Sequence, residues 1–135
     1  MTIQIDDLSA NAMLDAWEAH VGPSPTLEIR SGPAPANTAA AAQGTVLALV
    51  ALPADWLGNA AGRSKAKSGT WEDQSADASG TAAHYRILSS GGVCKLQGTV
   101  TATGGGGDMT VDNTVFAAGQ GFTVTSWAIS MPNNA

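Results

Sequence analysis

Short apolar segments separated by Gly- and Pro-containing turns are the feature that most constrains the fold of this chain. Turn signals recur about every 8–12 residues and delimit about seven or eight short strands. The predicted strands are Thr26–Ser31, Val46–Leu52, Asp55–Leu57, Thr81–Leu88, Cys94–Ala102, Met109–Val111, Val115–Phe116 and Phe122–Met131. These strands do not alternate with helices. The pattern therefore predicts a mainly β, antiparallel β-sandwich or jelly-roll-like fold.

Alternating side chains predict which face of each strand is buried. Leu27 and Ile29 share one face of the first strand, and Val46–Leu52 is apolar throughout, which predicts burial on both of its faces. On the later strands, we expect one group of side chains to point inward: Ala83, Tyr85, Ile87, Cys94, Leu96 and Val100. We expect the other group to point outward: His84, Arg86, Lys95, Gln97, Thr99 and Thr101.

The last predicted strand changes phase along its length. Phe122 and Val124 share one parity, whereas Trp127, Ile129 and Met131 share the other. This change indicates either a β-bulge near residues 125–126 or a strand that is covered on both faces.

One helix is predicted before the strands. Ser9 is a suitable N-cap, and Gly22 followed by Pro23 is a typical C-terminal stop. The apolar face is expected to consist of Met13, Ala16, Trp17 and Val21. We expect residues 1–22 to form an N-terminal arm and helix, and residues 23–135 to form a single β-domain. The helix must dock its Met13/Trp17 face on that domain or on a partner.

Three segments are predicted to be loops. Gly32–Gln43 is rich in Pro and Ala, and Gly58–Gly69 is small, polar and basic, which favours a mobile surface loop. Gly104–Gly107 has no following Lys-Ser/Thr pair, so a flexible hairpin turn is favoured over a phosphate-binding loop.

Charge argues against nucleic-acid binding. The 135-residue chain has a formal net charge of −5, whereas phosphate contact requires Lys and Arg. Arg63, Lys65 and Lys67 form a basic cluster, and an acidic cluster precedes it with Asp6, Asp7, Asp15 and Glu18. Each cluster is either a solvated surface or a surface that complements another copy or another protein.

No residue pattern predicts catalysis, a metal site or a cofactor. The two histidines, His20 and His84, lack partners at zinc-ligand spacing, and there is no Gly-x-Ser-x-Gly motif. Cys94 is the single cysteine, so we expect no internal disulfide and a buried thiol. The start of the chain lacks basic residues, and the apolar run Val46–Leu52 is too short to cross a bilayer. We therefore expect folding in a reducing cytoplasm and no membrane partner.

The four tryptophans are candidates for the core or for an interface. Trp17 and Trp127 lie on apolar faces, which predicts core packing. Trp56 and Trp71 flank the Gly58–Gly69 segment, where they either anchor it or present their rings to a partner. The candidate interface residues are Met13, Trp17, Trp56, Arg63, Lys65, Lys67 and Trp71.

A set of ordered motifs resembles a known group of proteins. These motifs are Leu27-Glu-Ile-Arg-Ser-Gly, Gly44-Thr-Val-Leu-Ala, Leu52-Pro-x-Asp-Trp56, Ser64-Lys-Ala-Lys-Ser-Gly-Thr-Trp71, Ala78-Ser-Gly-Thr-Ala-x-His-Tyr-Arg-Ile87, Gln97-Gly-Thr-Val100, Gly107-Asp-Met-Thr-Val-Asp-Asn113 and Ala118-Gly-Gln-Gly-Phe-Thr-Val-Thr-Ser126. Together they resemble small proteins encoded in tailed bacteriophages and prophages, commonly close to the major capsid gene. The chain also looks like the cement, or decoration, proteins of phage capsids.

The resemblance implies a non-enzymatic structural protein of the virion. It implies a jelly-roll-like domain on the outer surface of the capsid, assembled in the host bacterial cytoplasm. Its partners would be the major capsid protein and other copies of itself, as a dimer or trimer. Two alternatives stay open: a tail, neck or fibre-associated module, and a carbohydrate- or receptor-binding module in which Trp56 or Trp71 stacks on a sugar.

Overall fold

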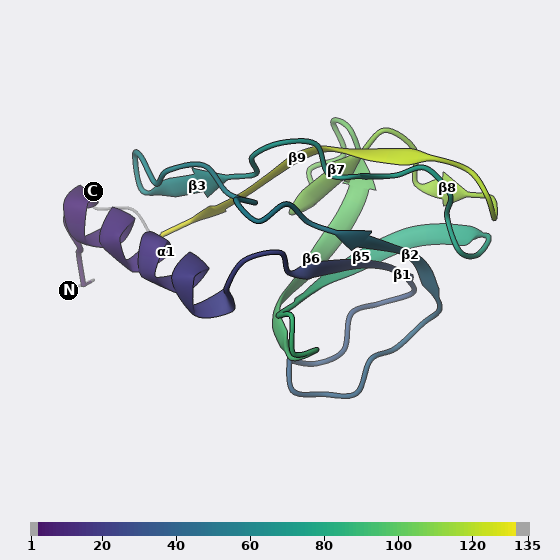
Figure 1. Ribbon diagram of the computed structural model, residues 1–135, viewed down its shortest axis with the longest axis horizontal. Helices are drawn as coiled ribbons and strands as arrows, with labels where there is room; N and C mark the ends of the chain where they lie inside the picture. The colour runs from purple at the N-terminus through teal and green to yellow at the C-terminus, as the bar shows by residue number, and fades with distance from the viewer. Residues whose placement is uncertain (1–2, 132–135) are drawn as a thin grey trace.

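The computed structural model describes residues 3–131 and is mainly β with one N-terminal helix, as predicted (Figure 1). Its helix is α1 (Asp7–Val21). Its strands are β1 (Thr26–Ser31), β2 (Val46–Ala51), β3 (Ser64–Ala66), β4 (Glu72–Asp73), β5 (Gly80–Leu88), β6 (Cys94–Ala102), β7 (Met109–Val111), β8 (Val115–Phe116) and β9 (Phe122–Ser130). The bounds of β1, β6, β7 and β8 match those predicted from the sequence.

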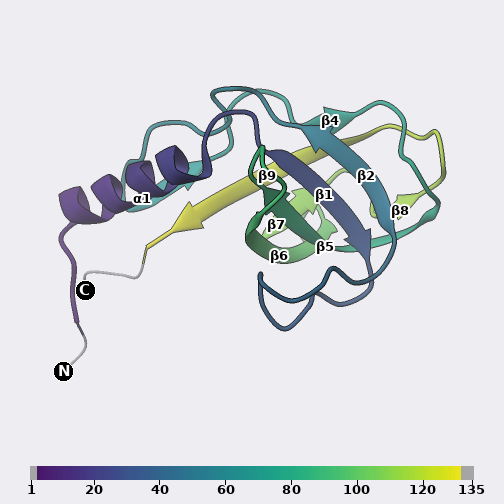
Figure 2. The same ribbon diagram turned by 60° about the horizontal axis from the view of Figure 1, so that its bottom comes forward.

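The strands form one curled, mixed sheet (Figure 2). The strand order is β2-β1-β5-β6-β7-β9-β3, with β4 paired to β9 and β8 paired to β5. The curl brings β4 beside β2, and the backbone N–H of Asp77 donates to the carbonyl of Leu47 at 2.7 Å. The two ends of the strand order therefore approach each other and enclose the core.

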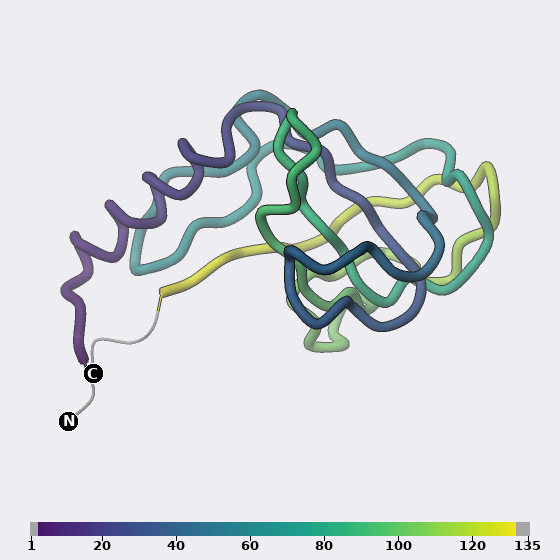
Figure 3. The backbone as a smooth tube through the Cα atoms, turned by 90° about the horizontal axis from the view of Figure 1, so that it is seen from below, coloured from purple at the N-terminus to yellow at the C-terminus, as the bar shows by residue number. Residues whose placement is uncertain are grey.

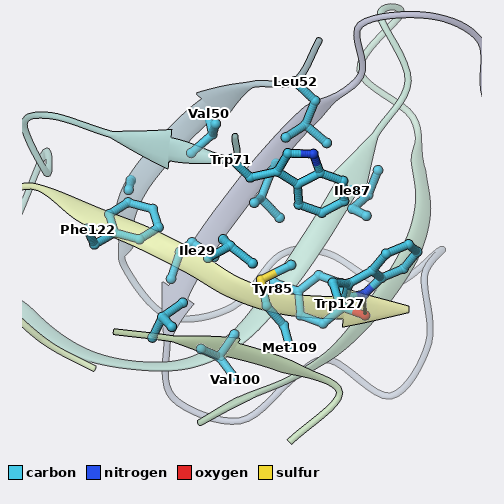
Figure 4. Packing of buried hydrophobic residues seen from close by; sticks show 14 of the residues in the cluster. Ile29, Val50, Leu52, Trp71, Tyr85, Ile87, Val100, Met109, Phe122 and Trp127 are labelled. Carbon is cyan, nitrogen blue, oxygen red and sulfur yellow. Dashed lines mark hydrogen bonds between the residues drawn. The ribbon is translucent and has the colours of Figure 1, made fainter. Parts of the chain in front are cut away.

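The core lies inside the curl, where side chains from opposite strands meet (Figure 4). Leu27, Ile29, Tyr85, Ile87 and Val100 are buried there, which confirms their predicted inward orientation. Burial of each such side chain contributes about 1.5–3 kcal/mol relative to exposure.

Cys94 was placed on the wrong face by the simple alternation. The register between β5 and β6 shifts between Ile87 and Leu88, so Leu88 pairs with Cys94. The Cys94 thiol consequently lies 3.2 Å from Nε of Arg86, on the face opposite to the core. The shift explains the error because each register step of one residue moves a side chain to the other face.

The Gly32–Gln43 segment is a loop, as predicted, and it covers the outer face of the sheet. The side chains expected to point into solvent, His84 and Arg86, are buried beneath it, as is Glu28. Arg86 donates to the carbonyl of Thr38 at 2.8 Å, and Nδ1 of His84 lies 2.7 Å from the carbonyl of Gly32. Backbone carbonyls of the loop thus satisfy polar groups that would be costly to bury alone.

Strand β2 is less covered than the sequence predicted. Leu49 is 50% exposed and Ala51 is also exposed, although both were expected to be buried. The reason is its place at the end of the strand order, where the outward side of Leu49 lies beyond the covering loop.

The phase change in β9 is a β-bulge, as one of the two alternatives predicted. Thr110 pairs with Ser126 and Val111 pairs with Val124, so Thr125 is the extra residue. Val124 and Trp127 are both buried as a result, despite their different parity.

The four glycines do not form a hairpin turn. Residues 103–108 return the chain so that β7 runs parallel to β6, with Val100 opposite Met109. Such a short parallel connection is unusual because parallel strands normally need a long crossover. It requires glycine: Gly104 and Gly106 have φ of +87° and +81°, and a Cβ on Gly105 or Gly107 would lie 2.8 Å from the Thr101 side chain.

The helix begins three residues earlier than predicted. Asp6, not Ser9, is the N-cap, and its carboxylate accepts the backbone N–H of Ser9 at 3.1 Å. The predicted end at Gly22 is confirmed, with φ of +91° there. The buried face consists of Ala10, Leu14 and Val21, with Trp17 partly buried, whereas Met13 is 49% exposed. The helix docks through the face that contains Ala10, Leu14 and Val21. Met13 therefore lies largely outside the buried face.

Candidate interaction surfaces

The acidic and basic clusters of the sequence bind each other within the chain. Nζ of Lys65 lies 2.6 Å from Asp15 Oδ1 and 2.7 Å from Glu18 Oε2, and Arg63 pairs with Asp7 at 3.0 Å. These contacts join β3 to α1. The two clusters thus complement each other within one chain, while the Asp7 and Asp15 side chains keep 64% and 56% of their surface exposed.

The segment Gly58–Gly69, expected to be a mobile surface loop, contains β3, which pairs with β9. The Lys65 side chain is 3% exposed, so its ammonium is almost entirely withdrawn from water. Burial by itself would lower the pKa of Lys65, but hydrogen bonds to Asp15 and Glu18 outweigh burial and raise it. The hydrogen bond from Lys65 lowers the pKa of Asp15 in turn. The charged forms of both groups are thus stabilised by the contact.

Trp56 and Trp71 are fully buried, which favours the alternative in which they anchor the segment over the one in which their rings face a partner. With Trp17 and Trp127 they form one cluster, whose neighbouring ring centroids lie 5.6–6.3 Å apart. Nε1 of Trp71 donates to the carbonyl of Ser68 at 3.1 Å. The cluster ties α1 and the segments around β3 to β9, and it explains why neither ring is available for stacking on a sugar.

Exposed apolar side chains are concentrated around α1, which projects from the curled sheet (Figure 3). Leu8 is 80% exposed and Met13 is 49% exposed on the side of α1 that faces away from the sheet. We call this side, with Leu8, Met13 and the exposed Ala12 and Ala16, the outer α1 surface. Of the predicted interface residues, Met13 is the one that the structure places openly on a surface, while Lys67 is partly exposed and bonds the carbonyl of Gly69.

A second candidate surface lies beside the start of β7, where the sheet divides. Strand β7 separates β6 from β9 at Met109–Val111, but the adjoining parts of β6 and β9 have no described strand between them. A hollow of about 250 Å³ occupies this place, which we call the β6–β9 gap. It is lined by Tyr85, Leu96, Gln97, Asp108, Trp127, Ala128, Ile129 and Ser130.

The floor of the β6–β9 gap is apolar, and its rim is polar. Nε1 of Trp127 donates to the Tyr85 hydroxyl at 2.7 Å, and burial raises the pKa of Tyr85 to about 12. Asp108 Oδ2 accepts the backbone N–H of Thr99 at 2.9 Å. Sequence reasoning missed this gap. The available signal was the brevity of Met109–Val111, which is much shorter than the strands on either side of it.

Within residues 3–131, no group of three His, Cys, Asp or Glu side chains is placed to hold a metal ion. No helix in this described part is long and apolar enough to span a membrane. Comparison of the chain with protein-family models, with curated proteins and with solved structures found no match.

Proposed function

We propose that this chain is a non-enzymatic structural protein of a tailed-phage virion. In this proposal it is a cement or decoration protein that binds the outer surface of the capsid and stabilises contacts between major capsid subunits. The ordered sequence motifs that resemble such proteins support the proposal, as does the mainly β fold. The proposal includes a β-sandwich or jelly-roll-like classification of the curled sheet.

The outer α1 surface is the observation that carries the proposal. Leu8 and Met13 stand exposed on a helix that is fixed to the domain by Lys65 and by the tryptophan cluster. An apolar surface that is held rigidly and projects from the domain suits a permanent contact between proteins, because little conformational entropy is lost on binding.

The charge distribution refines which residues would touch the capsid. Arg63 and Lys65 are engaged with Asp7, Asp15 and Glu18 in the same chain. We therefore assign the capsid contact to Leu8 and Met13 rather than to the basic cluster. The partners in this proposal are the major capsid protein and further copies of this chain.

The first test is the copy number of this protein in density-purified phage particles, measured by quantitative mass spectrometry against the major capsid protein. One copy per capsid subunit, or a simple fraction of one, is expected. A few copies per particle would move the protein to the tail or neck. Complete absence would overturn a role in the virion and make glycan binding the next assay.

The second test assigns the contact surface. Leu8→Asp is expected to weaken binding to capsids that lack this protein by at least about tenfold, because it places a charge in an apolar interface. Val115→Asp is the matched control, since Val115 is also an exposed apolar residue but lies on β8. Equal binding of the two variants would contradict the assignment of the outer α1 surface.

A further inference from the structure

The β6–β9 gap presents backbone groups from two strand edges. Just after β6, the N–H of Thr103 donates to the carbonyl of Val111, so the neighbouring odd-numbered residues of β6 face the β7 side. Upstream of β7, the same alternation turns the N–H and C=O groups of Gln97 towards the gap, and it stops at the register shift beside Lys95. No backbone partner for these groups exists among residues 3–131.

The opposite edge belongs to β9. Lys67 donates its N–H to the carbonyl of Trp127, and Met131 donates to the carbonyl of Arg63, so the odd-numbered residues here face β3. The N–H and C=O groups of Ala128 and Ser130 therefore face the gap. In the described part of the chain they too have no backbone partner.

Asp108 marks the point where strand pairing stops. Its side chain accepts the N–H of Thr99, which is the bond that a backbone carbonyl of a longer β7 would make. Just beyond it, the Gln97 side chain lies on the outer face with that of Arg86, and its Nε2 donates to the carbonyl of Pro35 at 2.8 Å.

The width of the gap suits one additional strand. At Val100 and Trp127, β7 itself separates β6 from β9, so the gap begins at the spacing that a single strand fills. Its floor consists of Leu96, Trp127 and Ile129, which would pack against the apolar residues of an alternating segment.

We propose that the β6–β9 gap receives the segment Ile3–Ile5 of a second copy of this chain as an added strand. The segment alternates Ile3, Gln4 and Ile5, which would place both isoleucines on the apolar floor and the glutamine on the polar rim. Ile3 is 86% exposed, and residues 3–5 belong to no described strand. The inference rests on the proposed function, which includes self-association of the chain, and it gives that self-association a structural basis.

The position of the segment favours exchange between copies. It lies before α1, at the end of the helix farthest from β6 (Figure 3). The guanidinium of Arg63 donates to the carbonyl of Ile5, which fixes the base of the segment and directs it away from its own sheet. Reciprocal exchange between two copies would give a closed two-fold dimer.

The test measures association of the purified full-length chain by sedimentation velocity, with hydrogen–deuterium exchange as a second readout. We expect concentration-dependent association and rising protection of the amides of Gln97, Ala128 and Ser130. Ala128→Pro is expected to weaken association at least about tenfold, because it removes an N–H that faces the gap. Ala128→Ser, which keeps that N–H, is the matched control and should associate normally.

A crosslink identifies the occupant of the gap and covers the case in which the proline variant fails to fold. Ile3→Cys combined with Ser130→Cys should form a disulfide between isotopically labelled and unlabelled chains, whereas Val115→Cys with Ser130→Cys should not. A monomer at every concentration, or association that persists unchanged in both Ala128→Pro and Ile3→Asp, would overturn the inference. The two proposals can fail separately. If Leu8→Asp abolishes capsid binding and Ile3→Asp does not affect it, the proposed function stands even when the strand exchange is disproved.

Discussion

The two halves of β9 differ in how they are paired, although they belong to one strand. Phe122 and Thr123 pair with β4 on one side, and Val124 and Ser126 pair with β7 on the other. Beyond the bulge, Ala128–Ser130 pairs with β3 and faces the gap. The difference originates in residues 103–108, because the glycine loop determines where β7 begins. A local loop conformation thus decides whether an edge inside the sheet is closed or open.

Replacing Trp127, which lies at the boundary between the two halves, is expected to have the largest effect. Its ring packs against Trp56 and Trp71, and its Nε1 bonds the Tyr85 hydroxyl. Trp127→Ala should lower the free energy of unfolding by about 3–5 kcal/mol, through lost burial and a residual cavity. Urea unfolding measures this, with Val115→Ala as an exposed control. A loss of unfolding free energy as small as that of the control would show that the junction between the two halves of β9 does not depend on the Trp127 ring.

A smaller effect is expected from changing the loop that sets the start of β7. Gly107→Ala would place a Cβ 2.8 Å from Cγ2 of Thr101 and should cost about 1–3 kcal/mol of stability. Gly91→Ala is the control, since its Cβ would lie at an ordinary distance of 3.9 Å from Oγ of Ser89. Equal unfolding midpoints for both variants would mean that the loop accommodates the added Cβ without loss of stability.

The smallest effect concerns the ion pairs behind β3, which support the second half of β9. The pKa of Asp15 is lower in the folded chain than its usual 3.8, so its contribution to stability is present above that pH and is lost as the pH falls through the folded value. Asp15→Asn should therefore flatten the decline in stability between about pH 5 and pH 3. Asp77→Asn is the control. If stability falls as steeply with decreasing pH in Asp15→Asn as in the wild type, Asp15 does not contribute to the acid sensitivity.

Local pattern was sufficient for much of the fold. The alternation of Leu27 and Ile29 located β1, and the parity change between Val124 and Trp127 indicated the bulge in β9. These features depend on neighbours in sequence, which a single sequence displays directly.

Contacts between distant segments could not be derived in the same way. His84 and Arg86 have a polar pattern typical of a solvent-exposed face, and their burial depends on a loop about 50 residues away. Lys65 and Asp15 were recognised as opposite charges, but nothing in their spacing showed that they bind each other. The parallel turn of the glycine loop was missed because glycine permits many conformations and the Thr101 side chain selects among them.

The tryptophan cluster also determines how the molecule would respond to partial unfolding. Trp17 of α1 meets Trp56 edge to face, with centroids 5.8 Å apart and planes inclined by 60°. Trp56 in turn contacts Trp71 and Trp127 in the sheet. The helix is thus joined to the β-core through a continuous set of indoles, and its detachment would change their shared near-ultraviolet circular dichroism. The chain carries its own optical reporter for whether α1 is docked, without any added label.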